Sequence, residues 1–118
     1  MATLLVLYRQ PQDTHAFDRH YLDVHVPLAL RLPGLRSLRA DRAVGGDPAL
    51  REYYLAVRME FDDREAMRAA LRSPEGQAAG HDLAQFATDG YLLMQLEPMA
   101  ELDAVHPGSD NHPAERTI

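Results

Sequence analysis

YYLAVRMEF, residues 53–61, is the stretch that decides the fold. Its residues alternate between two classes, as in a strand that turns one face to the core. The apolar class is expected to face the core and contains Tyr53, Leu55, Val57, Met59 and Phe61. The other class mixes an aromatic ring, a small residue and two charges: Tyr54, Ala56, Arg58 and Glu60. Such a mixture fits either a solvated surface or the lining of a cavity.

Three further segments have strand character, and each ends at a turn signal. They are residues 3–8 (TLLVLY), 35–44 (LRSLRADRAV) and 91–97 (YLLMQLE). The first and the last carry apolar residues in both alternation classes, so they require cover on both faces. We expect segment 3–8 to be central. The frequent charges of segment 35–44 suit an edge strand.

The two long segments that connect these strands show the apolar spacing of helices. Behind the N-cap candidate Asp13, apolar residues recur at helical spacing: Phe17, Tyr21, Val24 and Leu28. Pro27 falls inside this stripe and lacks an N–H, so the helix should kink or restart at residues 25–27. The second connection, residues 64–87, reads as two helical pieces with a break at residues 73–74.

The resulting order, β-α-β-β-α-β, predicts an α+β fold with a ferredoxin-like protomer. Its four-stranded antiparallel sheet carries both helical regions on one face. The other face stays open and apolar along segments 3–8 and 91–97, which is rare in a monomer. We therefore expect a homodimer, a dimeric α+β barrel in which two sheets meet, with a cleft in each subunit between sheet and helices.

Composition excludes several classes of protein. The chain has 118 residues, a net charge of −6 and a pI near 5.4, which argues against nucleic-acid binding. All twelve basic residues are arginine and cysteine is absent, so neither a Schiff-base lysine nor a thiolate nucleophile is available. The longest apolar run is residues 4–8, so we expect no membrane span and a cytoplasmic protein. We expect residues 1–98 to form the domain and residues 99–118 a largely flexible extension.

Three groups of residues resemble the EthD family of dimeric α+β barrel proteins. They are LVLYR at 5–9 followed by Phe17, Asp18 and Tyr21; HVPL at 25–28 with LPGL at 32–35; and SPEGQ at 73–77 followed by Asp82, Leu83 and Phe86. The likeness implies a ferredoxin-like homodimer and a cleft-facing histidine, which matches His25. Relatives include a muconolactone isomerase and polyketide-tailoring decarboxylases, dehydratases and cyclases. Leu38 stands where members often carry a tyrosine.

His25 is the candidate general acid or base. On an α-helix it lies about 80° from Phe17, at the border of the apolar stripe. From its position alone, His25 is better interpreted as a structural histidine at the edge of the apolar stripe, hydrogen-bonded to a backbone carbonyl that Pro27 leaves free. The family resemblance favours the other interpretation, a general acid or base. Tyr21, one turn earlier, is either core or a second catalytic residue whose hydroxyl bonds the imidazole or an oxyanion.

Four residues are candidates for substrate binding: Arg58, Tyr54, Leu28 and Phe86. If Arg58 reaches the cleft, its guanidinium can hold an enolate or carboxylate; otherwise it pairs with Glu60 or lies at the dimer surface. Phe86 forms a wall of the cleft or packs as ordinary core.

The sequence predicts no metal and no cofactor. His15, His20 and His25 are five residues apart, which on an α-helix places successive rings about 140° apart and on no common face. No phosphate loop, dinucleotide fingerprint or nucleophile elbow is present. We therefore predict a cofactor-free isomerase, cyclase, dehydratase or decarboxylase that acts on a hydrophobic oxygenated ring compound, such as a polyketide or lactone. Two alternatives stay open: a non-catalytic small-molecule binding protein, and a cofactor-independent oxygenase on the same fold.

Overall fold

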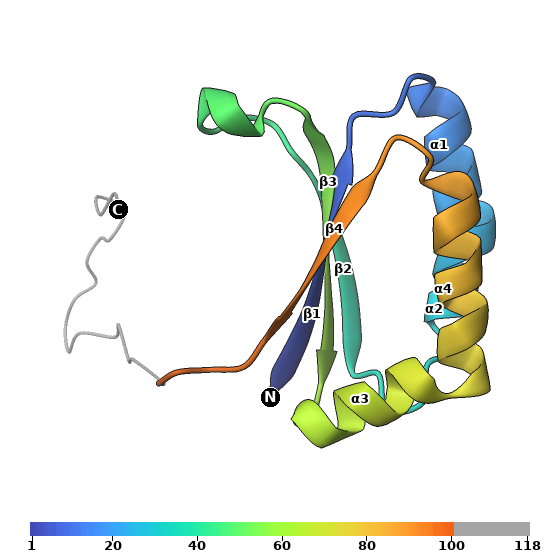
Figure 1. The fold of residues 1–118 in the computed structure, drawn as a ribbon, viewed down its shortest axis with the longest axis vertical. Helices are drawn as coiled ribbons and strands as arrows, with labels where there is room; N and C mark the ends of the chain where they lie inside the picture. Colours follow the sequence, from blue (N-terminus) through green and yellow to red (C-terminus); the bar gives the residue numbers. More distant parts are fainter. Residues whose placement is uncertain (101–118) are drawn as a thin grey trace, which may run out of the picture.

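The computed structural model describes residues 1–100 and shows one sheet covered on one face by helices (Figure 1). The sheet contains β1 (Ala2–Arg9), β2 (Ser37–Arg42), β3 (Tyr53–Phe61) and β4 (Tyr91–Leu96). All pairs are antiparallel and the order is β2-β3-β1-β4. The predicted α+β, ferredoxin-like fold is confirmed, with β1 central and β2 at an edge. Of the predicted extension, residues 101–118 lie outside the described part.

The helical layer consists of α1 (Thr14–His20), the π-helical turn η1 (Tyr21–His25), α2 (Val26–Ala29), α3 (Arg64–Arg72) and α4 (Pro74–Phe86). A short 3-10 turn, η2 (Pro48–Leu50), lies in the loop between β2 and β3. Within residues 1–100 no helix is long and apolar enough to span a membrane.

Side-chain caps explain where three of these helices begin. The carboxylates of Asp13 and Asp63 and the hydroxyl of Ser73 each accept a hydrogen bond from a backbone N–H three residues ahead, at 2.8–3.0 Å. Ser73 caps α4 directly after α3 ends, so the chain turns a sharp corner. Gly76 is required there, because a β-carbon would collide with the carbonyl oxygens of Ala70 and Leu71.

The core lies between the sheet and the helical layer. Alternate residues of the two central strands are buried against the helices: Leu4, Val6 and Tyr8 from β1, and Leu55, Val57, Met59 and Phe61 from β3. The predicted core face of β3 is therefore confirmed from Leu55 onward. Each of these side chains removes apolar surface from water and contributes on the order of 1.5–3 kcal/mol.

The predicted alternation is wrong at the start of β3. The pairing register shifts between Tyr8 and Arg9, which leaves Tyr54 as an extra residue in β3. Tyr54 is therefore buried on the helix side, edge-on to Phe17 with ring centroids 5.7 Å apart. Tyr53, expected in the core, is half-buried, and the guanidinium of Arg9 lies 5.0 Å from its ring.

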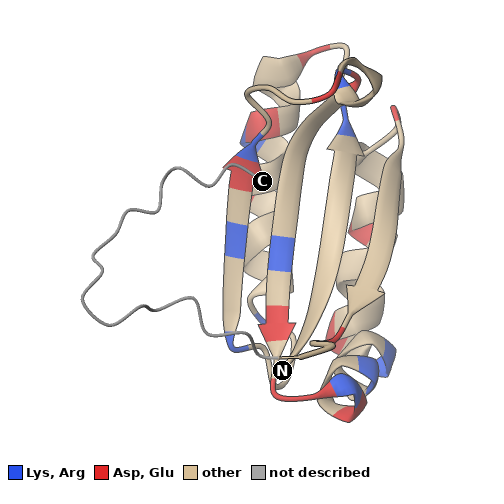
Figure 2. Cartoon of the chain, turned by 90° about the vertical axis from the view of Figure 1, so that its left-hand side faces the viewer, with Lys and Arg blue, Asp and Glu red and all other residues tan. Residues whose placement is uncertain are grey.

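The face of the sheet without helices carries a mixed surface (Figure 2). The middle of β2 and β3 bears charge on this side, whereas β1 and β4 present almost none. Leu5 and Leu7 of β1 pair with Met94 and Leu92 of β4, so these four side chains form an apolar half of the face. Met94 and Leu92 are 54% and 47% exposed, respectively.

Candidate functional site

A π-helical turn links α1 to α2 and sets the geometry of the site. In η1 the N–H of Val26 donates to the carbonyl of Tyr21, five residues earlier. Pro27 has no N–H to donate to Asp23, so an α-helical ladder could not continue through it. The predicted restart is confirmed, since α2 begins at Val26.

This turn brings His20 and His25 to the same carboxylate. In a π-helical turn, the backbone hydrogen bonds link residues five apart, so the side chains of two such residues point in similar directions. An α-helix would separate the same two side chains by about 140°. The expectation that His20 and His25 share no face is therefore wrong: both rings bond Asp82 of α4. Asp82 was not among the predicted site residues. Its signal in the sequence was its place in the third group of residues that carry the EthD resemblance, SPEGQ at 73–77 followed by Asp82, Leu83 and Phe86.

The cluster of His20, Asp82 and His25 is largely withdrawn from water. His25 Nδ1 lies 2.9 Å from Asp82 Oδ2, and His20 Nε2 lies 2.9 Å from Asp82 Oδ1 and 3.1 Å from Oδ2. The side chains of His25 and Asp82 are 8% and 12% exposed, whereas that of His20 is 34% exposed. His25 is thus the buried member and His20 the one that meets solvent.

The carboxylate determines which nitrogen of His25 is basic. Because Asp82 can only accept, Nδ1–H of His25 donates to it, and Nε2 keeps its lone pair. Nε2 has no hydrogen-bond partner within residues 1–100. Burial lowers the pKa of His25 below its ordinary value of 6.5, while the hydrogen bond and charge of Asp82 act in the opposite direction. The ring is therefore neutral at pH 7 and free to accept a proton at Nε2.

Aromatic rings surround this histidine. The Phe86 ring lies 4.7 Å from the ring of His20 and 5.0 Å from that of His25, measured between centroids. Tyr21 lies 5.8 Å from His25 and 5.8 Å from Tyr8. Burial raises the pKa of Tyr21 to about 12, so its hydroxyl is a neutral donor.

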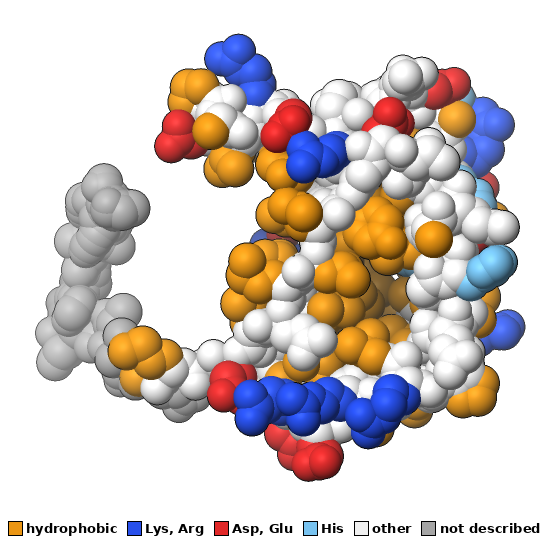
Figure 3. Space-filling model, in the orientation of Figure 1, with side chains coloured by type: hydrophobic (Ala, Val, Ile, Leu, Met, Phe, Trp, Pro, Cys, Tyr) orange, Lys and Arg blue, Asp and Glu red, His pale blue; other side chains and the backbone are white. Residues whose placement is uncertain are grey.

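The cleft opens between β4 and the helical layer. Figure 3 shows hydrophobic side chains around a hollow between the sheet and the helices. Leu93 pairs with Val6 and so lies on the helix-facing side of β4, yet it is 53% exposed because no helix covers this edge. At the top, a pocket of about 480 Å³ is lined by Phe17, His20, Phe86 and the loops at residues 11–13 and 88–89.

The predicted site residues divide into two groups. His25, Tyr21 and Phe86 lie together in the cluster just described. Tyr54 lies beside it, but its hydroxyl donates to Asp18 at 2.7 Å. Arg58 lies on the helix-free face of the sheet, exposed and opposite Leu5 and Arg39, and does not enter the cleft. Leu28 lines a separate depression with Pro74 and Ala78 between α2 and α4.

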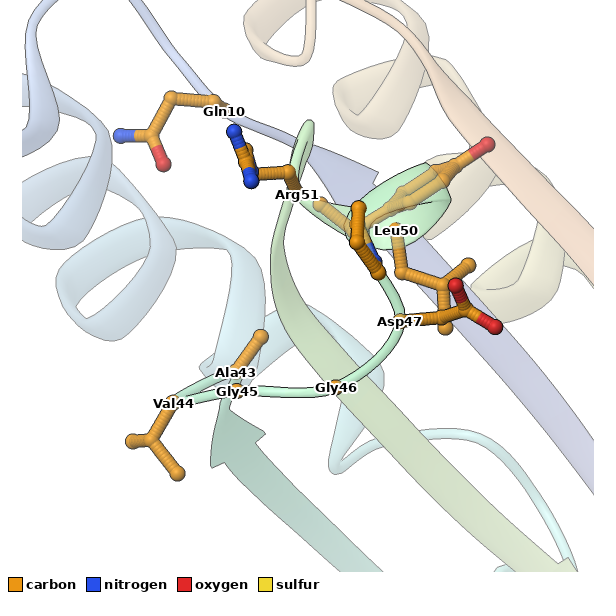
Figure 4. A pocket seen from close by; sticks show the side chains of 10 residues that line it. Gln10, Ala43, Val44, Gly45, Gly46, Asp47, Leu50 and Arg51 are labelled. Carbon is orange, nitrogen blue, oxygen red and sulfur yellow. The ribbon is translucent and has the colours of Figure 1, made fainter.

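A second pocket lies at the loop between β2 and β3 (Figure 4). Its volume is about 290 Å³, and Gln10, Asp47, Arg51 and Tyr53 contribute to its lining. No histidine lines this pocket. Within residues 1–100, no group of three or more His, Cys, Asp or Glu side chains is arranged to hold a metal ion.

The EthD domain model matches residues 9–90 of this chain. The protein belongs to the EthD family. This EthD protein is 32% identical over 94 residues to an uncharacterized 11.0 kDa protein from the thcB-thcC intergenic region of Rhodococcus erythropolis. That match covers 80% of this chain and 91% of the relative.

Solved structures agree with this assignment. An EthD family protein from Bacillus halodurans is 41% identical, with a TM-score of 0.78, over 84% of this chain and 99% of the other. A dimeric ferredoxin-like protein of unknown function from Jannaschia sp. shares the fold at 24% identity and a TM-score of 0.61, over 82% and 97%. SnoaB, a cofactor-independent oxygenase from Streptomyces nogalater, shares it at 18% identity and a TM-score of 0.60, over 86% and 95%.

Proposed function

We propose that this EthD protein is a cofactor-free proton-transfer enzyme with His25 as its general base and acid. The observation that carries the proposal is the buried Asp82–His25 pair, in which the His25 ring packs beside the rings of Tyr21 and Phe86. Fixing one imidazole nitrogen on a carboxylate orients the ring and stabilises the imidazolium that forms when the other nitrogen accepts a proton. The neutral ring at pH 7 suits it to act first as a base.

The surroundings define the class of substrate. Tyr8, Tyr21 and Phe86 offer apolar ring faces, and the polar groups nearby are the Asp82 cluster and two phenolic hydroxyls. Such a lining suits a planar, hydrophobic ring compound with a carbonyl, as in a polyketide or a lactone. His25 would take a proton from the carbon next to that carbonyl, and the Tyr21 hydroxyl would donate to the enolate oxygen.

Isomerisation, cyclisation, dehydration and decarboxylation all share this enolate step. The protein would act as a homodimer, as the apolar half of the open face suggests, and in the cytoplasm. No cofactor enters the proposed chemistry, because the imidazole alone exchanges protons with the substrate.

Deuterium exchange tests the proton-transfer step without knowledge of the natural substrate. Ring carbonyl compounds with an acidic C–H, such as 2-tetralone and a butenolide, are incubated with the protein in D2O, and incorporation next to the carbonyl is followed by mass spectrometry. We expect His25→Ala to lower the enzyme-catalysed exchange rate by at least about 100-fold. The matched control is His15→Ala, since His15 is exposed on the same helical segment and bonds only Arg19 among residues 1–100.

The same assay separates the alternatives. Exchange at equal rates with and without oxygen supports proton transfer, whereas product formation that needs oxygen indicates an oxygenase. Binding of the probes with no exchange, in both the native protein and the His25 variant, indicates a non-catalytic binding protein. Either of the last two results contradicts the proposal.

A further inference from the structure

Tyr8 occupies the centre of the aromatic cluster on the sheet side. It belongs to β1, is only 1% exposed and faces the helical layer. Its ring lies 5.3 Å from Phe17, 5.8 Å from Tyr21 and 5.9 Å from Phe86, measured between centroids. Three aromatic rings therefore hold the Tyr8 ring in one place.

The hydroxyl of Tyr8 has no hydrogen-bond partner within residues 1–100. A buried hydroxyl normally finds a partner, because leaving the donor unsatisfied away from water costs free energy. Tyr54 has such a partner, since its part-buried hydroxyl donates to Asp18 at 2.7 Å. Tyr21, 4% exposed, also leaves its hydroxyl without a partner in the described part of the chain.

The Tyr8 ring lies one ring away from the proposed catalytic histidine, since Tyr21 and Phe86 each contact both Tyr8 and His25. Burial raises the pKa of Tyr8 far above 10, and the nearby Tyr21, Asp82 and Tyr91 raise it further. Tyr8 is therefore a neutral donor. Tyr8, Tyr21 and His25 Nε2 thus form a set of three polar groups without protein partners among apolar rings, which is the arrangement of a binding site for a small polar atom.

We propose that Tyr8 is a substrate-binding residue whose hydroxyl donates a hydrogen bond to the carbonyl oxygen of the substrate. This inference rests on the proposed proton transfer and extends it. When Nε2 of His25 takes the proton, the C–H bond breaks, its electron pair forms a carbon–carbon double bond, and the carbonyl oxygen becomes an enolate oxygen. Tyr8 and Tyr21 then both donate to that oxygen. The imidazolium later returns the proton to the substrate, so no oxidant or reductant is needed.

The substrate class narrows accordingly to ring compounds with a carbonyl or hydroxyl oxygen on the carbon next to the one that exchanges its proton. Ring ketones, lactones and phenols are such compounds. A phenolate mimics the enolate, because it is planar, aromatic and negatively charged on oxygen. The probe is therefore 4-nitrophenol, whose ionised form absorbs visible light, and its partner is 4-nitrotoluene, which has a methyl group in place of the oxygen.

The test compares both probes on wild type and Tyr8→Phe. We expect the variant to bind 4-nitrophenolate about 10-fold more weakly, since one hydrogen bond to a charged oxygen is lost, and to bind 4-nitrotoluene unchanged. We also expect a thermal midpoint equal to or above that of wild type, because the deleted hydroxyl has no protein partner to lose. Tyr53→Phe is the matched control, as Tyr53 lies against Arg9 outside the cluster, and it should change neither affinity.

Three results overturn the inference: unchanged affinity of Tyr8→Phe for 4-nitrophenolate, an equal loss for both probes, or the absence of 4-nitrophenolate binding by wild type at millimolar concentration. None of these measurements involves turnover. If a His25→Ala variant exchanged deuterium at the wild-type rate, the proposed function would be overturned. The effect of Tyr8→Phe on 4-nitrophenolate affinity would still stand, so the two failures are distinguishable.

Discussion

At the scale of single residues, Asp82 controls the chemistry available to His25. It lies 62 residues from His20 and 57 from His25 in sequence, yet it bonds both rings. Two effects on the pKa of His25 oppose each other: burial lowers it by favouring the neutral ring, and the Asp82 carboxylate raises it by favouring the charged ring. The result is a base that is uncharged at pH 7 but remains able to accept a proton.

Asp82→Asn should therefore weaken His25 as a base. Asp82 raises the pKa of His25, so removing its charge should lower that pKa further. The exchange rate should rise with pH through the pKa of His25, and in the variant this rise should lie at lower pH. The plateau rate should fall by about 10- to 100-fold, since a weaker and less well oriented base remains. NMR titration of the His25 ring and the pH profile of exchange are the measurements; an unmoved titration midpoint would contradict the role of Asp82.

At the scale of elements, η1 decides which residues of the first helical region share a face. Periodicity placed His25 at the border of an α-helical stripe and so separated it from His20. The structure brings both rings to Asp82, because the i→i+5 ladder adds a residue to the turn. Such a turn was not predicted, since Pro27 breaks an α-helical ladder equally well with a kink, a restart or a π-helical turn.

Pro27→Ala should loosen this arrangement. The alanine restores an N–H, which permits the α-helical register and would rotate His25 away from Asp82. We expect a thermal midpoint close to that of wild type, because Pro27 lies in the first turn of α2, where a proline is tolerated. We expect the exchange activity and the low-field Nδ1–H proton signal of His25 to be lost together. Pro33→Ala, beyond the end of α2, is the control and should keep both.

At the scale of the whole molecule, the helix-free face of the sheet is the surface that the proposed homodimer would bury. Leu5, Leu7, Leu92 and Met94 form its apolar half, whereas the charge in the middle of the face lies on β2 and β3. Solved structures with this fold include proteins described as dimeric. Arg58, which we considered for the cleft, belongs to this face, opposite Arg39.

A charge placed on this face should separate the subunits. Leu92→Glu buries a carboxylate against apolar side chains if two sheets meet, so we expect a monomer by light scattering at micromolar concentration. Leu93→Glu is the matched control: it is the next residue, similarly exposed, but lies on the opposite side of the same strand. It should stay dimeric. A dimeric Leu92→Glu, or a monomeric wild type, would exclude face-to-face association of the sheets.

The sequence by itself determined the order of elements, the core face of β3 from Leu55 to Phe61 and the position of the helix break at Pro27. These follow from local periodicity, which has a period near 2 in strands and 3.6 in helices. Tertiary structure alone decided three further features. The register shift at Tyr8 and Arg9 turned Tyr54 inward, the π-helical turn joined His20 to His25, and α4 brought Asp82 to both. The first and the third depend on contacts between residues distant in sequence, about which local periodicity carries no information. The second is a local i→i+5 hydrogen bond that Pro27 permits but does not require.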